Sequence, residues 1–253
     1  MTDKIKVIIT APKGAMDSLI VQEAYKDENI EVVGCIGAPG RDYIGSDAGL
    51  VCGLGSEIGV TVSDNLNEII DTCDVVVDYS TTGLSMEVLD SCLRHGKGLL
   101  CGTTGFSDDE NAAFAKASET IPIMKTANTS YVVTVMRRLL AEAAEKIGAK
   151  CKIEVIEMHD QRKLDAPSGT AIEMGKAMAA AAPDKTYDDI EFHSVRAGNT
   201  PSSHRVIFGC MGEKMEISHD AYDWRCYAIG ACDGIKFLST AAPGRIYTMD
   251  DVI

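Results

Sequence analysis

The sequence predicts an α/β protein with a doubly wound parallel sheet and a smaller α+β domain that contains a mixed sheet. In the first half of the chain, short apolar runs alternate with segments that carry apolar residues at helical spacing. This alternation is typical of parallel strands joined by helices. In the second half, several strand-like runs accompany one helix-like run, which indicates a separate sheet. A length of 253 residues suits two modest domains or one large one.

The first domain is expected to contain five strands with helices between them. Strands are predicted at residues 6–10, 30–36, 74–79, 98–102 and 121–125. Helices are predicted near residues 15–24, at residues 86–94 and 108–119, with a short one ending at residue 71. This order is that of a Rossmann-type sheet, in which ligands bind at the carboxyl ends of the strands.

A long amphipathic helix is predicted at residues 131–147, because its apolar residues share one face. The second domain follows, with strands expected at residues 151–157, 188–195, 204–209 and 214–219 and a helix at residues 171–182. A final helix, residues 228–238, is expected to return to the first domain. We therefore assign residues 1–127 and 228–253 to the first domain and residues 128–227 to the second.

The composition excludes several classes of protein. A net charge of -14 argues against non-specific binding to nucleic acid or to anionic membranes. No apolar stretch reaches the ~20 residues of a membrane span, and the start of the chain lacks the pattern of a signal peptide. The nine cysteines include no Cys-x-x-Cys pair. We therefore expect reduced, buried cysteines in a cytoplasmic protein, without a disulfide framework or a metal site.

Residues 157–171 combine several groups that can carry chemistry. His159 can exchange a proton near neutral pH, and Lys163 can hold a carboxylate. A helix that starts at Ser168 or Thr170 would offer free N–H groups to an anion. These features predict a site for a small acidic substrate. The same residues would also fit a solvated connection between a strand and a helix.

The order of these residues resembles the signature of the dihydrodipicolinate reductase family, Glu-x-His-His-x-x-Lys-x-Asp-Ala-Pro-Ser-Gly-Thr-Ala. Every fixed position matches except the second histidine, which is Asp160. Further similar segments, in the family's order, are residues 45–49, 102–106, 195–198 and 227–231. The resemblance implies a homotetrameric oxidoreductase of lysine and diaminopimelate biosynthesis. It implies NADH- or NADPH-dependent reduction of dihydrodipicolinate, a cyclic unsaturated imine dicarboxylate, to tetrahydrodipicolinate.

The resemblance also implies roles for individual residues. His159 would be the general acid, and Lys163 would bind substrate and assist proton transfer. The second domain would bind substrate and form the oligomer. An acidic group beside His159 is expected to raise the pKa of that histidine and to repel a substrate carboxylate, so that Asp160→His should improve dicarboxylate binding. The substrate-binding positions implied are Asp160, Ser168, Gly169 and Thr170.

The expected phosphate-binding turn departs from the family pattern Gly-x-x-Gly-Arg-Met-Gly. The chain has Ala11-Pro12-Lys13-Gly14-Ala15-Met16-Asp17 and so lacks two glycines and the arginine. Asp17 would stabilise a helix start but repel a pyrophosphate. After the second strand, Gly37-Ala38 lacks the ribose carboxylate and the arginine for a 2′-phosphate. Lys13 and Arg41 are possible substitutes.

We expect weak binding of NADH or NADPH, with NADH no worse than NADPH. One alternative is a reductase-like protein that has lost its dinucleotide site and acts on a related acid without hydride transfer, or only binds a metabolite. Another is a reductase with a changed substrate, suggested by Asp160 and Val132. The cofactor-binding residues implied by the resemblance are Lys13, Gly14, Met16, Gly102, Thr103, Thr104, Ala127, Asn128 and Thr129.

Among the remaining candidate residues are two histidines and two arginines. His204 and His219 lie in strand patterns and are expected to be structural. Arg196 fits a structural role and a ligand contact equally well. Arg225 is expected to pair with a carboxylate.

Overall fold

The structure is a computed structural model that describes residues 3–253. The chain forms two compact units. The first contains the residues up to Thr129 together with Arg225–Ile253, and the second is Ser130–Trp224. No helix among the described residues is long and apolar enough to cross a membrane.

The sheet of the first unit is parallel throughout, in the strand order β11-β6-β5-β4-β1-β2-β3. The predicted doubly wound sheet is therefore confirmed. Because the order reverses between β1 and β4, the carboxyl ends of these strands border the switch point where such sheets bind ligands. The strands are β1 (Ile5–Thr10), β2 (Ile30–Ile36), β3 (Val62–Ser63), β4 (Val75–Asp78), β5 (Gly98–Cys101), β6 (Ile123–Lys125) and β11 (Ile246–Tyr247).

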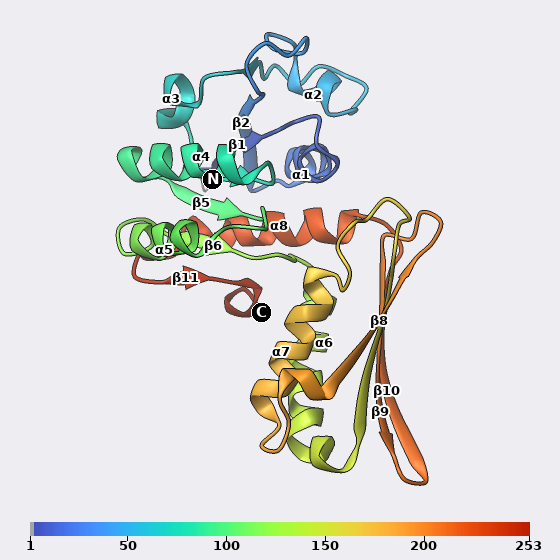
Figure 1. Cartoon of the computed structure of the whole chain (residues 1–253). Helices are drawn as coiled ribbons and strands as arrows, with labels where there is room; N and C mark the ends of the chain where they lie inside the picture. Colours follow the sequence, from blue (N-terminus) through green and yellow to red (C-terminus); the bar gives the residue numbers. More distant parts are fainter. Residues whose placement is uncertain (1–2) are drawn as a thin grey trace. The chain divides into compact units, whose positions relative to one another are not determined.

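Helices cover both faces of this sheet (Figure 1). On one face, α1 (Ala15–Lys26) packs against α8 (Arg225–Leu238), and on the other α4 (Thr82–His95) packs against α5 (Asp108–Ala117). The second face buries a core in which Ile8 and Leu99 of the sheet meet Phe114 of α5. The shorter helical segments are α2 (Ala48–Val51), α3 (Leu66–Ile69), η1 (Ile70–Thr72) and η4 (Met249–Asp251).

The sheet of the second unit is mixed, as predicted. In the order β10-β9-β7-β8, β7 and β8 run parallel, while β9 runs antiparallel to both β7 and β10. Two helices, α6 (Tyr131–Ile147) and α7 (Gly169–Ala181), lie side by side over this sheet (Figure 1). The strands are β7 (Lys152–His159), β8 (Ile190–Arg196), β9 (Ser202–Cys210) and β10 (Glu213–Ala221), and the short helices are η2 (Gly148–Lys150) and η3 (Tyr187–Asp189).

The core of the second unit lies between the helix pair and the sheet. Met136 and Leu140 of α6 and Met174 of α7 pack with strand residues that include Val155 and Phe208. The helix predicted at residues 131–147 has the observed bounds of α6. Strand β7, however, extends two residues beyond the predicted end, so that His159 is its last residue. His159 therefore occupies a fixed position on a sheet rather than in a loop.

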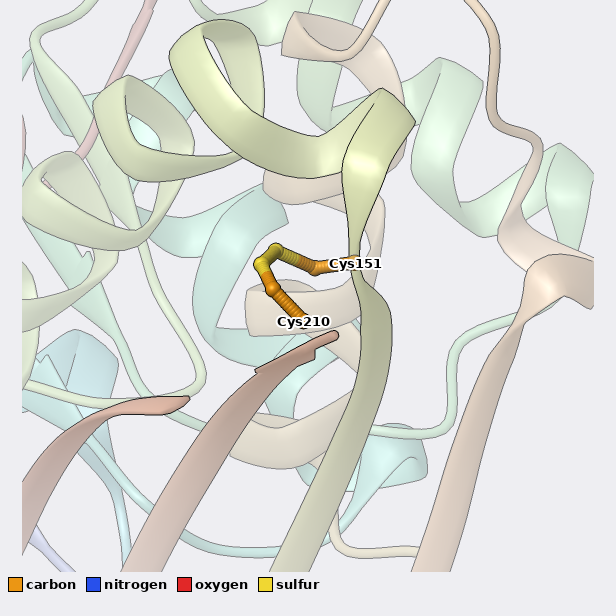
Figure 2. Close-up of a disulfide and its surroundings, with 2 residues drawn as sticks. All are labelled: Cys151 and Cys210. Atoms are coloured by element: carbon orange, nitrogen blue, oxygen red, sulfur yellow. A yellow bond between two sulfur atoms is a disulfide. The ribbon is translucent and has the colours of Figure 1, made fainter. Parts of the chain in front are cut away.

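Cys151 and Cys210 form a disulfide (Figure 2). The expectation that the cysteines are all reduced was wrong for this pair. Antiparallel pairing of β7 with β9 sets Lys152 opposite Gly209, and this register brings the two cysteine Cα atoms to 4.4 Å. The separation of 59 residues in the sequence gives no sign of that register.

Ala11 lies directly after β1 in the left-handed region, with φ of 45°, and is the only non-glycine residue with positive φ in residues 3–253. Its amide donates to the Ile36 carbonyl at 2.7 Å, and the Gly14 amide donates to the Ala11 carbonyl at 2.6 Å. The turn thus adopts a glycine-type conformation without the glycine. A side chain in this region costs about 1 kcal/mol.

We expect Ala11→Gly to raise the free energy of unfolding by about 0.5–1 kcal/mol, because glycine relieves the left-handed strain. The measurement is a urea unfolding curve. The matched control is Ala38→Gly, in a loop where φ is not positive. This control should be neutral or slightly destabilising, since glycine only adds freedom to the unfolded chain. An equal response of the two variants would contradict the assignment of strain to Ala11.

Candidate functional site

A pocket of about 370 Å³ lies at the carboxyl ends of β1, β4 and β5 in the first unit. Its position is the topological switch point of the sheet, where dinucleotides bind in this architecture. Five of the predicted cofactor-binding residues line it: Gly14, Met16, Gly102, Thr103 and Thr104. The rest of the lining is Ala15, Asp17, Tyr79, Ser80, Thr81 and Thr82. The lining does not include Lys13, Ala127, Asn128 or Thr129.

Thr129 is buried and hydrogen-bonded to other parts of the first unit. It is 1% exposed, and its hydroxyl donates to the Tyr227 carbonyl at 2.7 Å and accepts from the Tyr79 hydroxyl at 3.4 Å. A side chain at Gly230 would lie 1.7 Å from the Thr129 carbonyl oxygen, and one at Gly102 would lie 2.0 Å from the Tyr79 ring. The two glycines therefore allow the close packing that fixes Tyr79 beside the pocket.

Two carboxyl groups are buried near the floor of this pocket. Asp17, in the first turn of α1, is 1% exposed and accepts the Tyr79 amide at 3.2 Å. Burial, and then the charge of Asp78, raises the pKa of Asp17 well above its usual range. Burial of Asp17 and its raised pKa therefore weaken the expected repulsion between this residue and a pyrophosphate. Asp78 accepts hydroxyl groups from Thr10, Ser80, Ser85 and Thr103.

The second unit builds its polar site around Glu157, which is completely buried on β7. Arg196, the last residue of β8, binds both carboxylate oxygens, at 2.7 and 2.9 Å. The Ser168 amide donates to the same carboxylate at 3.3 Å. Although burial raises the pKa of Glu157, the side chains of Arg196, Ser194 and His159 lower it to about 2. Sequence reasoning left Arg196 open and missed Glu157, whose signal was its place two residues before His159 on the same strand face.

His159 lies beside this ion pair. Its Nδ1 bonds to the Glu157 carboxylate, so Nδ1 carries a proton and Nε2 is the atom left for a ligand. The residue is 5% exposed, and burial lowers the pKa of His159 despite the opposing effect of Glu157. With Nδ1 bonded to Glu157, the neutral imidazole can accept a proton at Nε2, and the charged imidazolium can donate one from the same atom.

Asp160 follows His159 but engages a different partner. Its carboxylate accepts from the Arg162 side chain at 2.8 and 3.0 Å and from the Arg162 amide at 2.8 Å. The expectation that Asp160 raises the pKa of His159 was wrong, because the pKa of His159 is lowered and its carboxylate partner is Glu157. The negative charge of Asp160 is compensated within its own turn.

The carboxylate of Asp165 lies at Lys163, near the start of α7. Lys163 Nζ lies 2.9 Å from Asp165 Oδ1; burial raises the pKa of Asp165, but Lys163 and then the backbone of Asp165 and Gly169 lower it below its usual value. Ser168 caps the helix, as predicted, by accepting the Ala171 amide at 3.2 Å. Thr170 is the second residue of α7. The cation and the helix start can therefore bind an acid group together.

Two further histidines extend the row of polar side chains from His159. The ring of His204 on β9 lies 5.3 Å from that of His159, and the ring of His219 on β10 lies 5.9 Å from that of His204. His204 is fully buried, neither of its ring nitrogens has a hydrogen-bond partner among residues 3–253, and burial lowers its pKa to about 3. A structural assignment from strand pattern alone did not place these rings next to His159.

One cluster has the residue types of a metal site. Ligand atoms of Glu154, Glu191 and His193 lie within 4.8 Å of one another. The ammonium of Lys152 lies 2.7 Å from Glu154 and 3.0 Å from Glu191. A lysine thus already supplies positive charge to these carboxylates, and the cluster does not require a metal.

We expect Arg196→Ala to destabilise the protein by roughly 3–5 kcal/mol, because it leaves the buried Glu157 charge without its main partner. The pKa of Glu157 is about 2 in the folded state against a usual value of 4.5. Its contribution to stability is therefore complete above about pH 4.5 and is lost as the pH falls towards 2. Urea unfolding at several pH values should show the deficit of the variant shrinking over this range.

The control for this experiment is Arg162→Ala. Arg162 also pairs with a carboxylate, but its side chain is 84% exposed. Its loss should cost less than about 1 kcal/mol. Equal effects of the two substitutions would contradict a central role for the buried pair.

Comparisons with known proteins cover both units. Residues 5–129 match the family model described as the N-terminus of dihydrodipicolinate reductase, and residues 132–253 match the model of its C-terminus. The chain is 34% identical over 265 residues to the 4-hydroxy-tetrahydrodipicolinate reductase of Citrifermentans bemidjiense and 33% identical to that of Geobacter metallireducens. In both cases the alignment covers 98% of each chain.

Solved structures agree with these matches. The dipicolinate-bound dihydrodipicolinate reductase from Paenisporosarcina sp. TG-14 superposes with a TM-score of 0.80 and 25% identity, covering 99% of this chain and 100% of that one. An amine dehydrogenase from Mycobacterium smegmatis has a TM-score of 0.72 at 16% identity and covers 98% and 96% of the two chains. The latter similarity concerns the fold alone.

Proposed function

The chain belongs to the dihydrodipicolinate reductase family, and we propose that it reduces dihydrodipicolinate to tetrahydrodipicolinate with NADH or NADPH in lysine and diaminopimelate biosynthesis. The observation that carries this proposal is the pairing of His159 with buried Glu157, next to a lysine and a helix start that already hold a carboxylate. Neither the comparisons nor the sites favour the alternative of a protein that lacks hydride transfer.

The residues of the second unit have distinct tasks in this proposal. Because Nδ1 keeps its proton on Glu157, the proton that His159 delivers to the substrate carbon is the Nε2 proton of its imidazolium form, which becomes a neutral imidazole, while Glu157 and Arg196 fix the orientation of the ring. Lys163 and the first turn of α7, with Ser168, Gly169 and Thr170, bind a substrate carboxylate. That carboxylate takes the place of Asp165 on Lys163. Asp160 is assigned to the substrate-binding loop through its pairing with Arg162.

The first unit is assigned to the dinucleotide, which supplies the hydride when bound. The residues at the switch point fit such a group in two respects. Ala11 preserves the left-handed turn, and a buried carboxyl oxygen of Asp17 lacks a partner at the pocket. Weak binding stays a prediction, but repulsion by an exposed Asp17 is no longer a reason for it.

The assembly and the location of the protein are further parts of the proposal. We propose a homotetramer built through the sheet of the second unit, and a cytoplasmic protein. Family membership supports the tetramer, and a role in amino-acid biosynthesis supports the location. Sedimentation equilibrium of the purified chain tests the tetramer directly.

His159→Ala and Lys163→Ala should each lower turnover by about 100-fold or more, because one removes the proton donor and the other a substrate contact. Turnover is followed by cofactor absorbance with freshly generated dihydrodipicolinate. The matched control is His193→Ala, since His193 is an exposed residue that pairs with Glu154. Full activity of both site variants would remove residues 157–171 from the mechanism.

NADH should bind no more weakly than NADPH, because the position expected for a 2′-phosphate arginine is Ala38. A calorimetric titration with each cofactor measures this ratio. Lys13→Ala and Arg41→Ala identify any substitute, since a cation that binds the 2′-phosphate supplies about 1.5–3 kcal/mol to NADPH alone. A strong NADPH preference that neither substitution changes would contradict the expectation.

A further inference from the structure

Asp17 has an unusual position for a carboxyl group. It lies in the first turn of the twelve-residue helix α1, lines the pocket of the first unit, and is 1% exposed. Its Oδ1 accepts the Tyr79 amide, whereas its Oδ2 is buried and has no hydrogen-bond partner among the described residues. A buried polar oxygen without a partner is unfavourable and indicates a contact that forms when a ligand binds.

The surroundings of Oδ2 point to the phosphate-binding turn. A side chain at Gly14 would lie 2.5 Å from Oδ2, so this oxygen lies directly against the glycine that begins the helix. No side chain caps the start of α1, because the N-cap is Gly14 itself. The helix start and Oδ2 therefore border the same end of the pocket. Backbone amides and the helix dipole attract an anion to this end.

The groups that face Asp17 disfavour its negative charge. They are Asp78 at the end of β4, Cys52 at the end of α2 and Cys35 on β2, together with the Tyr79 phenol after β4. None of these four becomes a cation. Burial, then the charge of Asp78 and to a smaller extent Cys52, raises the pKa of Asp17 against the lowering effect of backbone amides that include that of Tyr79, so its protonated form is stabilised in the folded protein. A protonated carboxyl has an O–H that can donate, which a carboxylate does not.

We propose that Asp17 is a cofactor-binding residue that acts as a neutral acid and donates a hydrogen bond from Oδ2 to a phosphate oxygen of the bound dinucleotide. This inference rests on the proposed function, since it takes the nicotinamide dinucleotide as the ligand of the pocket. A hydrogen bond from an acid to a phosphate oxygen is short and strong because its acceptor is charged. It replaces a contact that the missing glycines and arginine no longer make. Binding of the dinucleotide then requires a proton on the protein and weakens as the pH rises through the pKa of Asp17.

The test is a titration of the intact protein with NADH, by calorimetry or fluorescence, from pH 6 to pH 9. For the wild-type protein, Kd should increase with pH. Asp17→Ala removes the donor and should weaken binding about 10-fold at pH 6. Asp17→Asn keeps a neutral donor, and its Kd should stay within about 3-fold of wild type at pH 6 and change little with pH. The control Asp109→Asn, an exposed carboxylate in the first turn of α5, should leave Kd and its pH profile unchanged.

An increase in NADH affinity on substitution of Asp17 would overturn the proposal. Tighter NADH binding by Asp17→Ala or Asp17→Asn at pH 7 would show that an ionised Asp17 repels the phosphates, and the proposed function would still stand. Absence of NADH and NADPH binding by the wild-type protein would overturn both.

A second measurement needs no cofactor and serves if Asp17→Ala does not fold. A carboxyl whose pKa is raised on folding contributes stability that is complete below its unfolded pKa and is lost as the pH rises. In urea unfolding, wild type should therefore lose stability relative to Asp17→Asn as the pH rises above about 4. A constant difference between the two proteins across this range would show that Asp17 is not held neutral, and the proposal would fall.

Discussion

The site of the second unit depends on one buried carboxylate, that of Glu157. Its charge is held inside the protein by two hydrogen bonds from Arg196, an amide from Ser168 and the ring of His159. These partners come from β8, from the start of α7 and from β7 itself. Without the carboxylate, the partly buried arginine would lose its counter-charge, and the imidazole would lose the contact that places its proton on Nδ1. The strand ends and the helix start therefore form one electrostatic unit.

The first unit also buries carboxyl groups, those of Asp78 and Asp17. Hydroxyl groups on β1, on β5's following turn and on the segment after β4 converge on Asp78, and Asp17 occupies the adjacent space with one oxygen unpaired. Burial, and then the neighbouring charge of Asp78, raises the pKa of Asp17. The start of α1 lacks two of the usual glycines, but the carboxyl groups of Asp17 and Asp78 still place polar atoms beside the pocket. These carboxyl groups differ chemically from the backbone amides that a glycine-rich turn offers.

Sequence patterns predicted much of this architecture and only part of the site. The alternating runs identified the parallel sheet, and the spacing of Val133, Met136 and Leu140 identified α6. The motif identified His159 and Lys163 by type and order. It did not identify Glu157, Arg196 and His204 as neighbours, because their contact depends on strand register rather than on local sequence. The disulfide depends on the same register. The burial of Asp17 involves contact between the first turn of α1 and Tyr79, whereas residue type alone predicted a negative charge that repels a pyrophosphate.

The contact between Asp165 and Lys163 has a consequence for which molecules can enter the site. Asp165 is part of the same loop, so its local concentration at the lysine far exceeds that of any free acid. A metabolite with a single carboxylate gains little by exchanging places with it. A molecule with two acid groups can displace Asp165 with one group and gain binding energy from the other. Under the proposed function, Asp165 would compete with the substrate for Lys163 and so favour acids that carry two charges.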